Sequence, residues 1–236
     1  MSELNGSKTA TVDKARGDMV YLVLAGTFIG LLITCNLIFK KFIEIDFFGV
    51  YTFEISAGVL PYPLTFLITD LISELFGLKK ANKVVFVGLI VSVLVMLITL
   101  AANAFPAIEN SPLTNEEFEK TFGLTGAAVA SSMIAYLIAQ FVDVRIYHFW
   151  KRVTKGKHLW LRNNFSTLGS QLIDTTVVLL ILCGLGVLPW DIFWALYIGS
   201  FLFKFLAALL DTPLLYLFTA LLSSYIGLKP NEEYVD

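Results

Sequence analysis

PLTFLITDLISELFG, residues 63–77, is strongly apolar and yet carries a carboxylate, Asp70, near its middle. The same combination recurs in NNFSTLGSQLIDTTVVLLILCG, residues 163–184, around Asp174. A charged side chain at the centre of a membrane helix costs at least about 2.5–3.5 kcal/mol, and such residues generally mark substrate, ion or proton pathways. The two stretches therefore favour a transport protein that spans the membrane.

The composition of the whole chain also indicates a membrane protein. Of its 236 residues, 57% are hydrophobic and only 15% are charged, whereas soluble domains contain about 25% charged residues. The net charge of −2 and the lack of a long basic run argue against a nucleic-acid partner. Cys35 and Cys183 both lie in apolar segments, so we expect buried small side chains rather than a disulfide or a metal pair.

Apolar segments of about 20 residues, the length needed to cross a bilayer, predict six transmembrane helices and an all-α, polytopic membrane fold. They lie at roughly 19–39, 56–76, 83–105, 125–148, 165–188 and 192–225. Pro61, Pro63 and Pro213 predict a kink or a break in the second and sixth helices. We expect three parts: a cytoplasmic tail at 1–18, a transport domain at 19–225 and a cytoplasmic tail at 226–236.

Basic residues set the orientation of these helices, because Lys and Arg concentrate in cytoplasmic loops. With both termini in the cytoplasm, three basic residues fall outside, namely Lys40, Lys41 and Lys120. Arg145 and Lys204 fall in or near the membrane. The cytoplasmic side receives Lys8, Lys14, Arg16, Lys79, Lys80, Lys83, Lys151, Arg152, Lys155, Lys157, Arg162 and Lys229. The asymmetry predicts that both termini are cytoplasmic.

Asp70 and Glu74 lie four residues apart, on one face of the second predicted helix. Two carboxylates so close favour a proton on one of them. For Glu74 the alternative is an interfacial position, with the carboxylate reaching toward Lys79 and Lys80. For Asp70, one turn deeper, we favour a functional role.

An amide precedes a carboxylate by three residues in two further helices, as Gln140 with Asp143 and as Gln171 with Asp174. Each pair offers acceptor oxygens beside an amide that both donates and accepts, which suits the edge of a nucleobase. The alternative is a polar contact between packed helices, worth about 0.6 kcal/mol. Asp174, midway along its helix, is the strongest single candidate.

Lys204, Ala208 and Asp211 fall on one stripe of the sixth predicted helix. Lys204 is too deep to reach the interface, so it needs Asp174 or Asp143 as a partner. The predicted buried charges are Asp70, Glu74, Asp143, Asp174 and Asp211 against Arg145 and Lys204. This acidic surplus excludes anionic solutes and favours a cationic or donor-rich solute, or protons that travel with it.

Four stretches, in this order, resemble the queuosine precursor transporter family, also called the vitamin uptake transporter family. They are YPLTFLITDLISELFGLKKA (62–81), AQFVDVRIYHFWKR (139–152), LRNNFSTLGSQLIDTT (161–176) and FLFKFLAALLDTPLLY (201–216). The resemblance implies a six-helix inner-membrane carrier that imports 7-cyano-7-deazaguanine or 7-aminomethyl-7-deazaguanine. The substrate-binding positions that it implies are Asn36, Asp70, Glu74, Gln140, Asp143, Asn164, Gln171, Asp174 and Lys204.

A binding subunit of an energy-coupling-factor transporter is the alternative function, and the spacing Gly26-xxx-Gly30 would then be its docking surface. An intramembrane enzyme is disfavoured because the chain has no HExxH or nucleophile motif. It also has no GxxxxGK[ST] motif, and we expect no cofactor, metal or catalytic site. The preferred precursor, proton coupling and homo-oligomer formation stay open.

Overall fold

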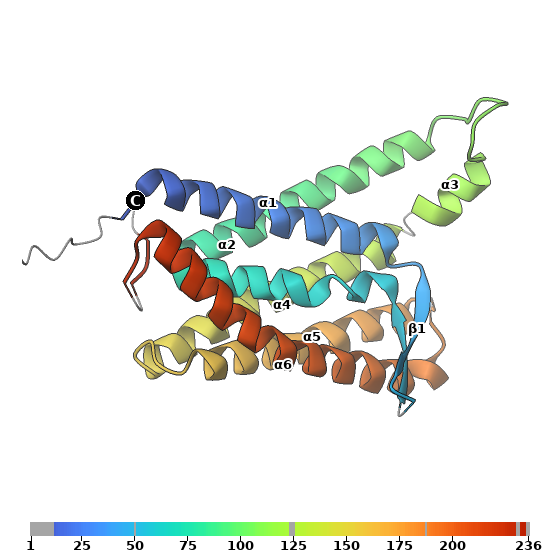
Figure 1. The fold of residues 1–236 in the computed structure, drawn as a ribbon. Helices are drawn as coiled ribbons and strands as arrows, with labels where there is room; N and C mark the ends of the chain where they lie inside the picture. The colour runs from blue at the N-terminus through green and yellow to red at the C-terminus, as the bar shows by residue number, and fades with distance from the viewer. Residues whose placement is uncertain (1–11, 50, 123–125, 187, 230–231, 235–236) are drawn as a thin grey trace, which may run out of the picture.

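Long helices account for most of the chain. The computed structural model describes residues 12–49, 51–122, 126–186, 188–229 and 232–234. In chain order the elements are α1 (Lys14–Ile38), β1 (Phe42–Phe47), β2 (Tyr51–Ser56), η1 (Ala57–Val59), α2 (Tyr62–Asn103), α3 (Asn115–Phe122), α4 (Gly126–Val153), α5 (Leu159–Gly184), η2 (Trp190–Ile192) and α6 (Phe193–Ile226). Figure 1 shows the long helices packed as an elongated bundle, with the hairpin at one end.

Several of these helices are suited to lipid. Among the described residues, four helical stretches are long and apolar enough to cross a membrane: Lys14–Ile38, Ala57–Asn103, Leu159–Gly184 and Trp190–Ile226. Large apolar side chains such as Leu22, Ile98 and Leu210 are exposed on them, as expected for helices that contact lipid rather than water. The count of six crossings and the cytoplasmic side of the termini stay predictions.

The second and third predicted spans form one helical element, α2, which is interrupted at Gly77. This residue has φ 81° and ψ 172°, a left-handed backbone conformation that glycine adopts without steric cost. Figure 1 shows α2 running away from the hairpin end and then back toward α3. The short first half, residues 62–76, therefore carries Asp70 and Glu74.

A β-hairpin connects α1 to α2, so the all-α prediction is wrong for this segment. The strands pair antiparallel with Glu44 opposite Glu54, and both glutamates are exposed. Phe53 and Ile55 of β2 are buried instead, and the Phe53 ring lies 5.9 Å from that of Phe203 in α6. The alternation of apolar and polar residues in this segment is typical of a strand. The search for apolar segments of about 20 residues could not detect strands of six residues.

The prolines were predicted to kink or break two helices, and the prediction fails for the helix that begins at Pro61 and Pro63. Pro61 is the N-cap of α2 and Pro63 lies in its first turn, where a missing N–H costs nothing. The predicted kink at Pro61 and Pro63 is therefore wrong. Pro213 lies inside α6, which remains one helix and bends part-way along its length in Figure 1.

The described ends of the chain meet at one end of the bundle. The backbone N–H of Asp13 donates to the carbonyl of Ile226 at 2.9 Å, and α1 begins at Lys14, within the expected tail 1–18. Residues 1–11, 230–231 and 235–236 of the two expected tails lie outside the described residues. Cys35 and Cys183 are buried and form no disulfide, as predicted.

Candidate functional site

Polar side chains gather in the interior between α2, α4, α5 and α6. The predicted stripe Lys204, Ala208 and Asp211 is buried on α6, which confirms that face. Both predicted amide–carboxylate pairs are buried too. The buried polar side chains of these helices include Thr65, Thr69, Asp70, Ser73, Glu74, Gln140, Asp143, Arg162, Asn163, Ser166, Thr167, Ser170, Gln171, Asp174, Thr175, Lys204 and Asp211.

Lys204 forms an ion pair with Asp174, one of its two predicted partners. The distance from Nζ to Oδ2 is 2.7 Å, and Nζ also donates to Thr175 Oγ1 at 3.0 Å. The ammonium lies 4.7 Å from the centre of the Tyr62 ring. Asp174 Oδ1 has no hydrogen-bond partner among the described residues, so one acceptor oxygen of the pair stays available.

Glu74 is held by three donors near the break in α2. Arg162 Nη2 contacts Glu74 Oε1, Tyr147 Oη donates to Oε2 at 3.1 Å, and Lys151 Nζ lies 3.3 Å from Oε2. Arg162 Nη1 also donates to the carbonyl of Gly156 at 2.8 Å. The carboxylate is therefore neutralised inside the bundle by α4 and α5, and not at the interface by its neighbours in sequence.

The identity of the buried cation corrects the sequence-based assignment. Arg145 is exposed, whereas Arg162, which was assigned to a cytoplasmic loop, is 1% exposed. The reason is that α5 begins at Leu159, six residues before the predicted span, so Arg162 belongs to the helix. Two signals in the sequence could have identified it: Arg162 directly precedes the polar run Asn163-Asn164, and Glu74 required a cation.

Asp70, Asp143 and Asp211 are buried carboxylates with no ion-pair partner among the residues that the structure describes. Asp143 Oδ1 accepts a hydrogen bond from Ser170 Oγ at 3.0 Å, while neither oxygen of Asp70 has a hydrogen-bond partner among the described residues. The Asp70 carboxyl lies close enough to Asp143, Asp211 and Glu74 to interact with all three electrostatically. Within the described chain no Lys or Arg forms an ion pair with these three aspartates. Ionised carboxylates only accept, so this group requires a proton or an external donor.

The amides of the site differ in their partners. Gln140 Oε1 accepts from Thr69 Oγ1 at 3.4 Å, whereas Gln171 Oε1 has no partner among the described residues. Asn164 Nδ2 donates to Thr212 Oγ1 at 2.9 Å and so connects α5 to α6. The structure thus brings Gln140 and Gln171 to the same interior as the carboxylates, with Asn164 at its margin.

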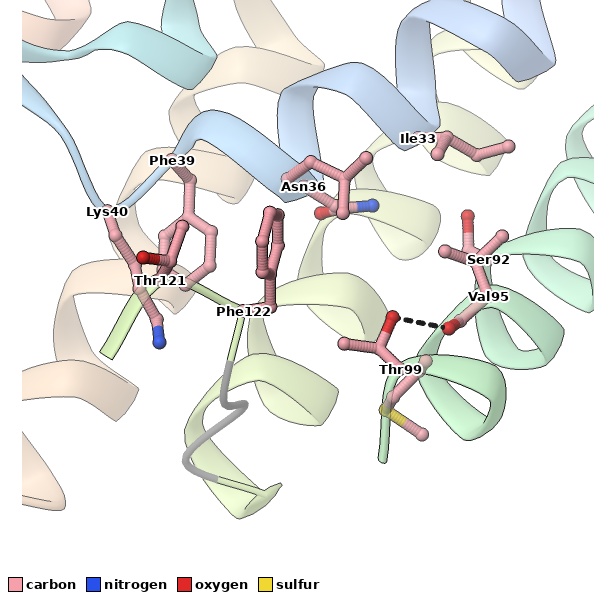
Figure 2. A pocket seen from close by; sticks show the side chains of 11 residues that line it. Ile33, Asn36, Phe39, Lys40, Ser92, Val95, Thr99, Thr121 and Phe122 are labelled. Carbon is pink, nitrogen blue, oxygen red and sulfur yellow. Dashed lines mark hydrogen bonds between the residues drawn. The ribbon is translucent and has the colours of Figure 1, made fainter. Parts of the chain in front are cut away.

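Asn36 lies apart from the other predicted binding residues. It lines a cavity of about 30 Å³ between α1, the second half of α2 and α3. Figure 2 shows the Asn36 amide and the Ser92 hydroxyl on opposite sides of this cavity. Such a volume holds about two water molecules and is too small for a fused-ring ligand. The resemblance placed Asn36 with the binding residues, but in this structure no contact joins it to the described carboxylates.

The site offers unpartnered hydrogen-bond acceptors. Among the described residues no group of three or more His, Cys, Asp or Glu side chains is arranged to hold a metal ion. Unpartnered buried oxygens occur on Asp70, Asp143, Gln171 and Asp174. Leaving a buried polar atom unpaired costs about 1–3 kcal/mol. Five such oxygens on these four residues, two of them on Asp70, therefore leave a considerable hydrogen-bonding cost unmet within the described chain.

The sequence of this chain is similar to those of known transport proteins. Residues 56–218 match the family described as "Putative vitamin uptake transporter". The chain is 29% identical over 174 residues to the "Probable queuosine precursor transporter" of Bacillus subtilis (strain 168), with 73% of each chain covered. It is 26% identical over 134 residues to the "Queuosine precursor transporter" of Escherichia coli (strain K12), with 54% of each chain covered.

A third relative, the "Probable queuosine precursor transporter" of Haemophilus influenzae, is 30% identical over 132 residues, which cover 54% of this chain and 51% of that one. No solved structure is significantly similar to this chain. The range matched by the family contains the whole buried group from Asp70 to Asp211, and Asn36 lies outside it. The chain therefore belongs to the vitamin uptake transporter family and is an integral, multi-pass membrane transport protein.

Proposed function

We propose that this protein imports queuosine precursors, 7-cyano-7-deazaguanine, 7-aminomethyl-7-deazaguanine or both, across the cell inner membrane as a single-component secondary carrier. One observation carries the proposal: buried acceptor oxygens on α2, α4 and α5 lack donors within the described chain. A solute with several adjacent N–H groups would supply those donors. The names of the relatives point to the same class of solute.

The donor pattern of a deazaguanine fits Asp70 best. The ring N–H and the exocyclic amino group lie side by side, so one carboxylate can accept from both. Asp70 offers two unpartnered oxygens, whereas Asp174 already gives one oxygen to Lys204. The amide of Gln171 would reach the carbonyl edge of the ring. An aminomethyl cation would be attracted to Asp143, beside Asp70.

The nine predicted binding residues take different parts in this proposal. Asp70, Asp143 and Gln171 contact the solute, and Gln140 and Asp174 complete the acceptor surface around it. Lys204 fixes the carboxylate of Asp174. The remaining residues would act at a distance from the ring, as a closing contact on one side or along the path to the site: Asn36, Glu74 and Asn164.

Transport would follow from alternate exposure of the buried group to the two sides of the membrane. The interruption at Gly77 and the proline-containing bend of α6 are positions where helical segments can move relative to each other. In the empty site, a proton shared by Asp70 and Asp143 would relieve the repulsion between them. Such a proton could travel with the solute.

Uptake into vesicles tests this function directly. Purified protein reconstituted in lipid vesicles should accumulate labelled 7-cyano-7-deazaguanine or 7-aminomethyl-7-deazaguanine, and unlabelled precursor should compete better than guanine. Asp70→Asn should abolish uptake, while Lys120→Met, a substitution of an exposed residue of α3, should leave it unchanged. Uptake equal to that of empty vesicles, with and without a proton gradient, would refute the proposal.

A binding subunit that requires an energising partner is the second candidate, and one observation favours it. Gly26 and Gly30 of α1 are exposed, and a Cβ built on either would meet no atom within 4 Å. This small-residue face is thus available for close approach by another helix. Purification from a native membrane with a bound scaffold protein and ATPases would favour this candidate. Uptake by the protein alone would exclude it.

A further inference from the structure

The first half of α2 ends at the buried residue Gly77, and two of its freed carbonyl groups are capped from elsewhere in the chain. A helix end leaves its last carbonyls without intrahelical partners, and Gly77 creates such an end. The carbonyl of Glu74 accepts from Lys151 Nζ at 3.2 Å. The carbonyl of Leu75 accepts from the backbone N–H of Tyr234 at 2.7 Å. The C-terminal segment therefore caps the helix that carries Asp70.

Tyr234 is packed as tightly as a core residue. The residue is 3% exposed, and its ring lies 5.4 Å from the ring of Phe76. Its hydroxyl donates to Asp18 Oδ1 at 2.9 Å. A Cβ on Gly17 would lie 2.3 Å from the Tyr234 ring, so glycine at this position makes room for it. Tyr234 thus ties α1 to the break in α2.

Glu233 connects the same segment to the buried ion pairs. Its Oε1 lies 2.9 Å from Lys151 Nζ, and the same ammonium lies 3.3 Å from Glu74 Oε2. A Cβ added at Gly77 would meet Glu233 Oε2 at 2.5 Å. Lys151 is therefore shared between the C-terminal segment and the Glu74–Arg162 pair. Removing Glu233 would change the charge balance at the end of the first half of α2.

We propose that Glu233 and Tyr234 form a latch that holds the bundle closed at this end, and that transport requires the latch to leave Gly77. The inference rests on the proposed transport cycle, because a latch has a role only where the buried site must open. Both latch residues act through α2, so they are positioning residues for Asp70 rather than contacts for the solute. The positive-inside distribution predicts that this end is the cytoplasmic one.

Cysteine accessibility tests the latch without any solute. Ser73 is fully buried one turn before the break, so Ser73→Cys, with Cys35 and Cys183 replaced by serine, reports opening through its reaction with a maleimide. In lipid nanodiscs, Glu233→Gln and Tyr234→Ala should raise the labelling rate of Ser73→Cys at least fivefold. Glu232→Gln is the matched control, because Glu232 is exposed and its hydrogen bonds within the described part of the chain are to Lys229 in its own turn.

Two further measurements keep the test decisive. Tyr234→Phe retains the ring but loses the hydroxyl bond to Asp18, so its labelling rate should fall between those of the parent and Tyr234→Ala. If the parent protein takes up a precursor, Glu233→Gln should change the maximal rate of uptake more than it changes the precursor concentration that gives half of that rate. Equal labelling in Glu233→Gln and Glu232→Gln would overturn the latch. Since labelling needs no solute, a failure of precursor uptake would count against the proposed function and leave this result intact.

Discussion

Lys204→Met isolates the energetic consequence of a buried ion pair in the candidate site. Lys204 Nζ and Asp174 Oδ2 are 2.7 Å apart, and both side chains are less than one tenth exposed. Removing one partner strands the other charge, which typically costs about 3–5 kcal/mol. Since every 1.4 kcal/mol is a factor of ten, the unfolding equilibrium should shift by about two to three and a half powers of ten.

The double variant Lys204→Met with Asp174→Asn separates stability from function. It removes both charges, and replacing a whole buried pair by neutral groups is often close to neutral for stability. Most of the lost stability should therefore return. Uptake should nevertheless be lost in the double variant, because the proposed acceptor surface lacks the Asp174 carboxylate.

Equilibrium unfolding in mixed micelles with a rising share of denaturing detergent, followed by tryptophan fluorescence, measures these differences. Lys120→Met is the control, because its contact with Glu116, 2.8 Å from Nζ to Oε1, is mostly exposed and such pairs contribute little. The reasoning fails if Lys204→Met is no less stable than Lys120→Met, or if the double variant is as unstable as the single one.

Three further predictions follow from the same structure. Asp70→Asn should abolish uptake without lowering stability, because the carboxylate has no hydrogen-bond partner to lose among the described residues; uptake and unfolding of one preparation decide this. Arg162→Met should lower stability by less than the roughly 3–5 kcal/mol of a fully stranded charge, because Glu74 loses one cation but keeps Lys151, and thermal unfolding that does not recover on adding Glu74→Gln would contradict it. The N–H and hydroxyl of Thr114 bond to Glu117 and lower the pKa of that carboxyl below its usual value. The stability that these hydrogen bonds give to the start of α3 is therefore fully present above the ordinary pKa of a glutamate. It is lost as the pH falls through the lowered pKa of Glu117. A carbon-13 titration of Glu117 that gives an unshifted pKa would disprove it.

The polar positions of the site were largely predictable from the sequence, and the reason is energetic. A Lys and an Asp deep in apolar helices each require a partner, which identified Asp174 as one of two candidates for Lys204. Helical spacing likewise placed Gln140 and Asp143 on one buried face. Helical periodicity and the cost of burying a charge thus identify polar side chains that need a partner on the same helix or on a neighbouring long helix.

Features that depend on where an element begins could not be predicted in this way. Arg162 was counted as a loop charge because the apolar run starts after it, although α5 starts before it. The break at Gly77 depends on a backbone conformation that the letter G permits but does not require. The capping of Leu75 by Tyr234 joins residues far apart in sequence, and no local pattern encodes such a contact.

The packing of Tyr234 also bears on how the protein is made. The residue bonds to Asp18, 216 positions earlier in the chain. At about 5–20 residues per second, a ribosome needs roughly 10–40 s to synthesise the intervening chain. During that interval α1 and the first half of α2 have entered the bilayer without their final cap. Docking of Tyr234 would therefore follow the insertion of α1 and α2, and a nascent chain that stalls before it would present an incompletely capped helix to membrane proteases.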